Sequence, residues 1–347
     1  MSGEDTPRGD VGADTSAPTG REAVPQVLRG GGERRLRRGA KGRGERSMVP
    51  RAEFRDYYGR PVIKAPAWQA RDIAGYFFLG GLAGAGSVLA AGAHATGRTS
   101  TATALKCSSL GAVSLATAAL IHDLGRPARF GNMLRVMKPT SPMSVGSWLL
   151  AGYGPLAGGA AVSALTGRLP RTGAAATGAA ALLGPAVAAY TAVLAADTAV
   201  PAWHDAYREL PYLFCASATA AASGMALAAG PVRENGPARC AAVLAAAADA
   251  AAEKAADRSL GMVAETWHTG RAGRLIRAAR VLTTAGAAGS ALFGGRSRAA
   301  ACASGLALLA GSACTRFGVF AAGIASAEDP AYTVVPQRER TAARQDG

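Results

Sequence analysis

Residues 73–93, "IAGYFFLGGLAGAGSVLAAGA", are the stretch that decides the fold class of this chain. The stretch contains no charged side chain. As a helix it would be long enough to cross the hydrocarbon core of a bilayer, which is roughly 30 Å thick. It lies too far from the N-terminus to be a secretory signal peptide. The sequence therefore predicts a transmembrane helix here.

Seven further apolar runs follow, so we predict an all-α integral membrane protein with about eight transmembrane helices, arranged as two four-helix bundles. Counting residues 73–93 as the first of eight runs, the second run carries Lys106, the sixth carries Asp249 and the eighth carries Arg316. The Ala-rich sixth and seventh runs would insert poorly alone, so we expect neighbouring helices to hold them. The seven runs cover about residues 103–121, 142–165, 173–196, 210–230, 237–252, 278–293 and 299–325.

The composition leaves one alternative, a soluble Ala-rich helical protein. Of the 347 residues, 49% are hydrophobic, and the mean hydropathy is only +0.13. Polar tails and loops dilute that average, however. Chargeless runs of about twenty residues have few uses outside a membrane. We therefore favour the membrane protein.

The polar ends of the chain set the domain boundaries. Residues 1–47 are rich in Gly, Pro and Arg and have no repeating apolar face, so we expect a disordered basic tail. Its cluster "ERRLRRGAKGR" suits either anionic lipid headgroups or a solvated tail, and Met48 is an alternative start. A juxtamembrane segment (48–71), the membrane domain (72–326) and a disordered C-terminal tail (327–347) follow.

The distribution of Lys and Arg predicts the orientation. Eight spans place both termini on one side, and most basic residues of the short loops fall on that side. By the positive-inside rule, both termini are cytoplasmic and the protein lies in the cell membrane. Orientation and tail explain the formal net charge of +15, so no nucleic-acid partner is needed.

Cysteine and histidine spacing argues against a redox centre of the chain's own. The five cysteines are scattered without a CxxC pair, so we expect neither a metal site nor an iron-sulfur cluster. A membrane haem needs two facing histidines at compatible depth. Among the four histidines, only His122 and His204 share a level, and both lie at the membrane surface. We therefore expect no haem.

Polar and aromatic residues from five helices converge near the cytoplasmic edge on this topology. Taken singly, each is typical of a boundary anchor. Together they suit a quinone headgroup, whose two carbonyl oxygens accept hydrogen bonds and whose reduction takes up protons. The residues are Tyr76, His122, Asp123, Arg126, Trp148, Trp203, His204 and Asp205.

The loop over residues 122–148, "HDLGRPARFGNMLRVMKPTSPMSVGSW", resembles the signature loop of the NrfD/PsrC family, the membrane subunits of polysulfide reductase-like and formate-linked molybdoenzyme complexes. Two more parts of the chain are similar to that family. The first combines "EFRDYYGRPVIKAPAW" with "YFFLGGLAGAGSVL", and the second is "PAWHDAYRELPYLFCASATAAASG". The resemblance covers about residues 49–325.

The resemblance implies an eight-helix subunit without haem that interacts with menaquinone or ubiquinone. It would exchange electrons between the quinone pool and a ferredoxin-like iron-sulfur partner, which serves a molybdopterin catalytic subunit of formate dehydrogenase or polysulfide reductase type. Proton translocation is a further expectation for such a complex.

The same resemblance implies roles for individual residues. Tyr76, His122 and Asp123 would bind the headgroup and transfer protons. Independently of the resemblance, Asp249 and Arg316 lie inside apolar runs and are candidates for a proton path through the second half of the bundle. The alternative is that each pairs with another helix or extends to the membrane boundary. Trp148, His204 and Asp205 would complete the quinone site, with Glu209 at its mouth. The residues expected to dock the partner are Arg126, Arg129, Arg135 and Lys138.

Two other classes stay open. A secondary transporter would also be an Ala- and Gly-rich bundle, although broken helices at matching positions of the two halves are not evident. A purely structural anchor for a dehydrogenase would keep the basic loop but would need no cluster of His, Tyr and Asp.

Overall fold

The structure is a computed structural model that describes residues 62–125 and 128–345, and for residues 128, 129, 343 and 345 it describes the backbone alone. The described residues form helices joined by short turns, without strands. The long helices are α1 (Ala70–Ala95), α2 (Thr99–Asp123), α4 (Pro142–Thr166), α5 (Pro170–Ala196), α7 (Leu210–Ala229), α8 (Gly236–Leu260), α10 (Gly270–Leu292) and α11 (Arg298–Glu328). The shorter ones are α3 (Ala128–Met133), α6 (Pro201–His204), η1 (Val232–Glu234), η2 (Gly261–Ala264), α9 (Glu265–His268) and α12 (Ala331–Gln345).

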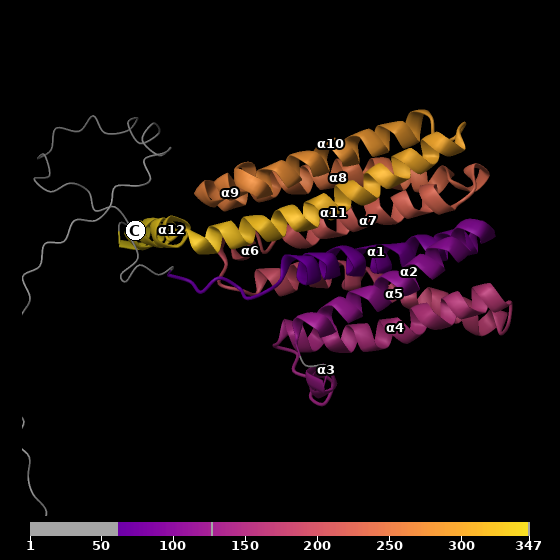
Figure 1. Ribbon diagram of the computed structural model, residues 1–347, viewed down its shortest axis with the longest axis horizontal. Coiled ribbons are helices and arrows are strands. Elements are labelled where there is room, and N and C mark those ends of the chain that lie inside the picture. Colours follow the sequence, from indigo (N-terminus) through magenta and orange to yellow (C-terminus); the bar gives the residue numbers. More distant parts are fainter. Residues whose placement is uncertain (1–61, 126–127, 346–347) are drawn as a thin grey trace, which may run out of the picture. The chain divides into compact units, whose positions relative to one another are not determined.

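The eight long helices pack as two four-helix bundles, which confirms the expected arrangement. Helices α1, α2, α4 and α5 contact one another and form bundle 1, whereas α7, α8, α10 and α11 form bundle 2. The bundles meet where α1 packs against α7 and α11, and where α5 packs against α7 (Figure 1). We call the end that carries α3, α6, α9 and α12 the loop side, and the other end the opposite side.

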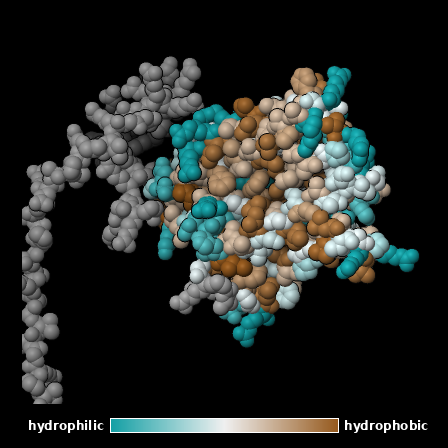
Figure 2. All heavy atoms as spheres, turned by 45° about the vertical axis from the view of Figure 1, so that its right-hand side comes forward, coloured by the Kyte–Doolittle hydropathy of each residue, from teal (hydrophilic) through white to brown (hydrophobic). Residues whose placement is uncertain are grey.

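Six of the long helices are long and apolar enough to cross a membrane: α1, α2, α4, α5, α7 and α11. Helices α8 and α10 have the length but carry more charge, which includes Asp249 and Glu253 on α8 and Arg277 and Arg280 on α10. The chain is therefore a multi-pass helical membrane protein, and a count of eight spans stays a prediction. In Figure 2, apolar residues cover broad parts of the visible face, and hydrophilic residues gather near its margins.

Close contact between glycines holds the first and fourth helix of each bundle together. Gly84 of α1 lies against the backbone of Gly184 on α5, and a Cβ on either residue would collide with the carbonyl oxygen of the other. Gly224 of α7 and Gly305 of α11 meet in the same way in bundle 2. Because lipid offers little hydrophobic gain for pairing helices, such close approach supplies much of their attraction.

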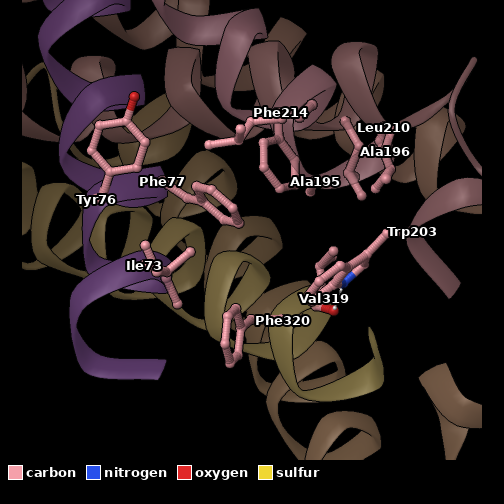
Figure 3. Close-up of a cluster of buried hydrophobic side chains, with 14 of the residues drawn as sticks. Ile73, Tyr76, Phe77, Ala195, Ala196, Trp203, Leu210, Phe214, Val319 and Phe320 are labelled. Atoms are coloured by element: carbon pink, nitrogen blue, oxygen red, sulfur yellow. Dashed lines mark hydrogen bonds between the residues drawn. The ribbon is translucent and has the colours of Figure 1, made fainter. Parts of the chain in front are cut away.

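The largest side chains of the core gather where the bundles meet on the loop side (Figure 3). Trp203 of α6 is fully buried, and its indole N–H donates to the carbonyl of Val319 at 2.8 Å. Gly323 makes room for this ring, since a Cβ there would collide with the indole. Trp68 stacks on the ring with centroids 5.6 Å apart. Trp203 is therefore a core residue, although the sequence placed it among the residues of the membrane edge.

The C-terminal segment is helical, in contrast to the tail expected over residues 327–347. Helix α11 continues to Glu328, and α12 packs against the end of α11 and against η2. Tyr332 and Thr333 lie partly or fully inside this contact. Burial raises the pKa of the Tyr332 phenol, and the nearby Glu265 and Asp329 add to the rise. The high charge of the segment concealed an amphipathic helix. The expected tail over residues 1–47 lies outside the described residues.

Polar contacts between helices of bundle 2 close the helix ends on the opposite side. Arg298 donates to the carbonyl oxygens of Leu227 and Ala228 at the end of α7. Arg239 donates to Ser290 and Ala291 near the end of α10, at 2.9 and 2.8 Å. The last carbonyls of a helix lack intrahelical partners and carry partial negative charge. A guanidinium there donates hydrogen bonds to these carbonyls and balances their charge.

At the start of α2, Glu234 accepts a hydrogen bond from a backbone N–H that has no partner within the helix. Its Oε2 accepts the backbone N–H of Thr101 at 2.8 Å, and this bond lowers the pKa of the Glu234 carboxyl. Because the pKa of this carboxyl is lower in the folded state, the contact stabilises the fold at pH values above the unfolded-state pKa. This stabilisation is lost as the pH falls through the folded-state pKa. We therefore expect Glu234→Gln to lower the thermal midpoint at pH 7, and its difference from the wild type to shrink below about pH 4. An equal difference at both pH values would contradict this assignment.

Candidate functional site

An imidazole–carboxylate pair marks the loop-side end of bundle 1. His122 lies in the last turn of α2, and its Nδ1 is 2.8 Å from Oδ2 of Asp72 in the first turn of α1. The His122 side chain is 72% exposed, whereas that of Asp72 is 11% exposed. An ionised carboxylate only accepts hydrogen bonds, so Asp72 fixes the ring with Nδ1–H toward itself. This arrangement leaves the other ring nitrogen for chemistry.

Tyr76 stands one helical turn deeper than Asp72 on the same face of α1. It is almost fully buried, and its ring packs beside Phe77 with centroids 6.0 Å apart. In Figure 3 its hydroxyl points away from the rings of Phe77, Phe320 and Trp203. Asp72 and Tyr76 thus form a short polar line that leads inward from His122.

Asp123 has a different surrounding from the one expected. Its Oδ1 accepts the backbone N–H of Gln69, the residue before α1, at 3.3 Å. The neighbouring Trp68 stacks on Trp203, which precedes His204. The segment before α1 therefore connects the end of α2 with α6. Asp123 anchors this segment and is half-buried rather than aimed at His122.

His204 and Asp205 lie apart from His122, in the walls of two cavities under α12. Each cavity has a volume of about 620 Å³, and both are bordered by His204, Asp205 and Arg340. Nδ1 of His204 lies 3.1 Å from the carbonyl oxygen of Ala196, so this nitrogen donates. Nη2 of Arg340 is 3.9 Å from Oδ1 of Asp205. The first cavity also takes in Asp197, Tyr332 and Thr333.

The structure therefore divides the predicted cluster into two groups. His122 with Tyr76 forms one, and His204 with Asp205 forms the other. Trp148 belongs to neither, because it lies on the outer face of α4 with an exposed ring, as a membrane-belt residue does.

Sequence reasoning missed Asp72, the partner of His122. One signal was available, since Asp72 precedes Tyr76 by four residues and the two residues must share a helix face. The first apolar run begins at Ile73, so Asp72 falls just outside the stretch that identifies the helix.

The expected docking loop is exposed where the structure describes it. Arg135, Val136, Met137 and Lys138 are all exposed, and Ser144 pins the loop by accepting the N–H of Lys138 and donating to the carbonyl of Val136. Helix α3 precedes this loop and contacts bundle 1 through α4 (Figure 1). Of the four residues expected to dock the partner, Arg126 and the side chain of Arg129 lie outside the described residues.

The histidines of the described part have separate partners. His94, on the opposite side, lies 3.4 Å from Nζ of Lys106, and His268 lies 3.0 Å from Oδ1 of Asp257. Within the described ranges, no three His, Cys, Asp or Glu side chains gather as metal ligands would. The cysteines are free.

Two packed four-helix bundles with six membrane-capable helices and a polar pair at one end define a multi-pass helical membrane protein. Residues 67–236 match the family model described as "Polysulphide reductase, NrfD". Over this region the chain belongs to the NrfD family, as the loop and its flanking helices had indicated. The match supports a membrane subunit of polysulphide reductase-type complexes. No curated protein matches the chain significantly.

Proposed function

We propose that this chain is the quinone-interacting membrane subunit of an oxidoreductase complex. It exchanges electrons between the quinone pool and an iron-sulfur partner subunit, which serves a molybdopterin enzyme of formate dehydrogenase or polysulfide reductase type. The observation that carries the proposal is the pair of His122 with Asp72, with Tyr76 one turn deeper.

The donor set suits a quinone headgroup. A quinone supplies two carbonyl oxygens that accept hydrogen bonds, and its reduction takes up protons. His122 offers an exposed imidazole next to water, and the buried carboxylate of Asp72 stabilises the ring when it is protonated. His122 would therefore donate to a carbonyl oxygen and pass protons between water and the site. His204 and Asp205 would border its mouth on the side of α12.

The partner would bind at the loop side. Arg135 and Lys138 are exposed beside Val136 and Met137, so the loop combines charge with apolar area. Such a surface suits a partner with an acidic rim around an apolar centre. We assign the iron-sulfur cluster to that partner because the five cysteines of this chain are scattered along it. From the charge count, we place the loop side and both termini in the cytoplasm of the cell membrane.

Gentle detergent purification through a tag on this chain tests the proposal. Subunits are identified by mass spectrometry, and iron, molybdenum, tungsten, haem and quinone are assayed in the same sample. We expect an iron-sulfur subunit and quinone to be recovered. A lone protein without quinone, from cells that express the neighbouring subunits, would indicate a transporter instead. Recovery of the enzyme without quinone would indicate an anchor.

A charge-reversal pair tests the docking surface in the same purification. Arg135→Glu with Lys138→Glu should lower recovery of the partner about tenfold, because like charges would face each other at the contact. The matched control is Arg168→Glu with Arg171→Glu, which alters two exposed arginines on the opposite side. Equal recovery from both variants would place the docking surface elsewhere.

A further inference from the structure

Helix α8 carries a row of three carboxylates that the proposed quinone site does not use. Asp249, Glu253 and Asp257 are spaced by four residues, so they stack on one face of the helix at successive turns. We call these three residues the acid row. It extends about 12 Å along the helix. The Asp257 side chain is 29% exposed, whereas Glu253 and Asp249 are both buried residues, at 8% and 6%. The row therefore leads from loop-side water into bundle 2.

The two outer carboxylates each pair with a basic side chain from a neighbouring element. Asp257 Oδ1 lies 3.0 Å from Nε2 of His268 on α9. Glu253 receives Arg280 of α10 through two contacts, 2.5 Å from Nη2 to Oε1 and 3.4 Å from Nε to Oε2. These contacts hold the outer carboxylates in place, and His268 offers a group that exchanges protons near neutral pH.

The inner end of the row is different, because both of its ionisable groups keep unsatisfied atoms. Among the described residues, Oδ1 of Asp249 has no hydrogen-bond partner, and neither have Nε and Nη1 of Arg316. Arg316 is 0% exposed and stands on α11, which packs against α10 and α7, the two helices that contact α8. A buried carboxylate and a buried guanidinium rarely lack hydrogen-bond partners in folded proteins, because each is costly to desolvate. A water molecule would satisfy these atoms by accepting from the guanidinium and donating to the carboxylate, and a proton on Asp249 would remove its unpaired charge.

Arg316 also reaches the boundary between the bundles. Its guanidinium lies 3.8 Å from the ring centroid of Phe214 on α7, and Nη2 donates to the carbonyl of the same residue. A Cβ on Gly81 of α1 would lie 3.1 Å from Nη2, so the arginine fills the space opposite that glycine. Phe214 packs against Phe77, the neighbour of Tyr76 (Figure 3). The inner end of the acid row thus faces the bundle that holds Tyr76.

We infer that the acid row is a proton-transfer route from loop-side water to Asp249 and Arg316 at the bundle junction. A proton taken from water by His268 or Asp257 passes to Glu253 and then to Asp249. At each step one O–H or N–H bond breaks and one O–H or N–H bond forms, and no electron moves. Residues four apart on a helix have Cβ atoms about 5–6 Å apart, so a water molecule between two neighbouring carboxylates would bridge them. Arg280 and Arg316 stay charged and balance the carboxylates between transfers.

The use of the proton at the inner end rests on the proposed function, because quinone reduction consumes one proton for each electron. The route itself can be tested without quinone. Infrared difference spectroscopy of the purified full-length chain, on stepping the pH, reports the carbonyl stretch of a protonated carboxyl group. We expect one such band to disappear in Asp249→Asn.

Hydrogen–deuterium exchange of that band then tests the path. Glu253→Gln should leave the band in place and slow its exchange at least tenfold, and Glu253→Asp should restore the rate. The matched control is Glu328→Gln, which removes an exposed carboxylate on the same side and should change neither property. A band that is missing from the wild type, or an exchange rate unaffected by Glu253→Gln, would overturn the route. Since no quinone is present, that result would leave the proposed quinone function to the purification test.

Discussion

His122→Ala and Asp72→Asn are each expected to reduce quinone-linked turnover of the complex by roughly 100-fold or more, the usual contribution of a positioned acid or base. The first change removes the imidazole. The second keeps the shape of the side chain but removes the charge that orients the ring and stabilises its protonated form. Turnover is measured with purified complex and added quinone, and assembly is checked by recovery of the partner subunit.

His94→Ala is the matched control for this pair. His94 is also a histidine at a helix end, but it lies on the opposite side beside Lys106. We expect it to leave turnover within about twofold of the wild type, because general acid–base catalysis requires contact with the reacting group. Normal turnover in well-assembled His122→Ala would remove the His122 and Asp72 pair from the site.

Gly84→Ala and Gly184→Ala are expected to lower the thermal midpoint of the purified protein by roughly 5–10 °C each. A Cβ at either position collides with a backbone carbonyl of the facing helix, and a backbone cannot rotate away as a side chain can. Helices α1 and α5 must therefore separate, which loosens bundle 1. A fluorescence-based melt in detergent measures the midpoint.

Gly178→Ala provides the comparison within α5. No atom lies within 4 Å of the position that its Cβ would occupy, so the substitution should be neutral or slightly stabilising through helix propensity. If Gly184→Ala and Gly178→Ala have the same thermal midpoint, the close contact between Gly84 and Gly184 does not hold bundle 1 together.

The sequence predicted the eight long helices because lipid imposes a simple rule, that a spanning segment must be apolar and continuous. It failed where tertiary contacts outweigh composition. Trp203 is buried because Gly323 leaves space and Val319 accepts its N–H, and both residues are more than one hundred positions away in the chain. Helix α12 has too much charge to register as an apolar run, yet its inner face packs against η2.

The candidate site shows the same division between local and distant information. The depth of His122 and Tyr76 followed from counting helices, and the structure places both at the loop-side end of bundle 1 or one turn within it. The partner of His122 did not follow, since pairing depends on which faces of α1 and α2 meet. The placement of His204 and Asp205 in cavities bordered by α12 did not follow either, since the sequence did not predict that α12 is a helix.

The unequal apolarity of the two bundles has a consequence for how the chain is made. All four helices of bundle 1 are long and apolar enough to cross a bilayer, but in bundle 2 only α7 and α11 meet that standard. Helix α8 packs on α7, which has already left the ribosome when α8 emerges. Helix α10 packs most extensively on α11, which is synthesised after it. If α10 crosses the membrane as predicted, we expect bundle 2 to be completed only when α11 has been inserted.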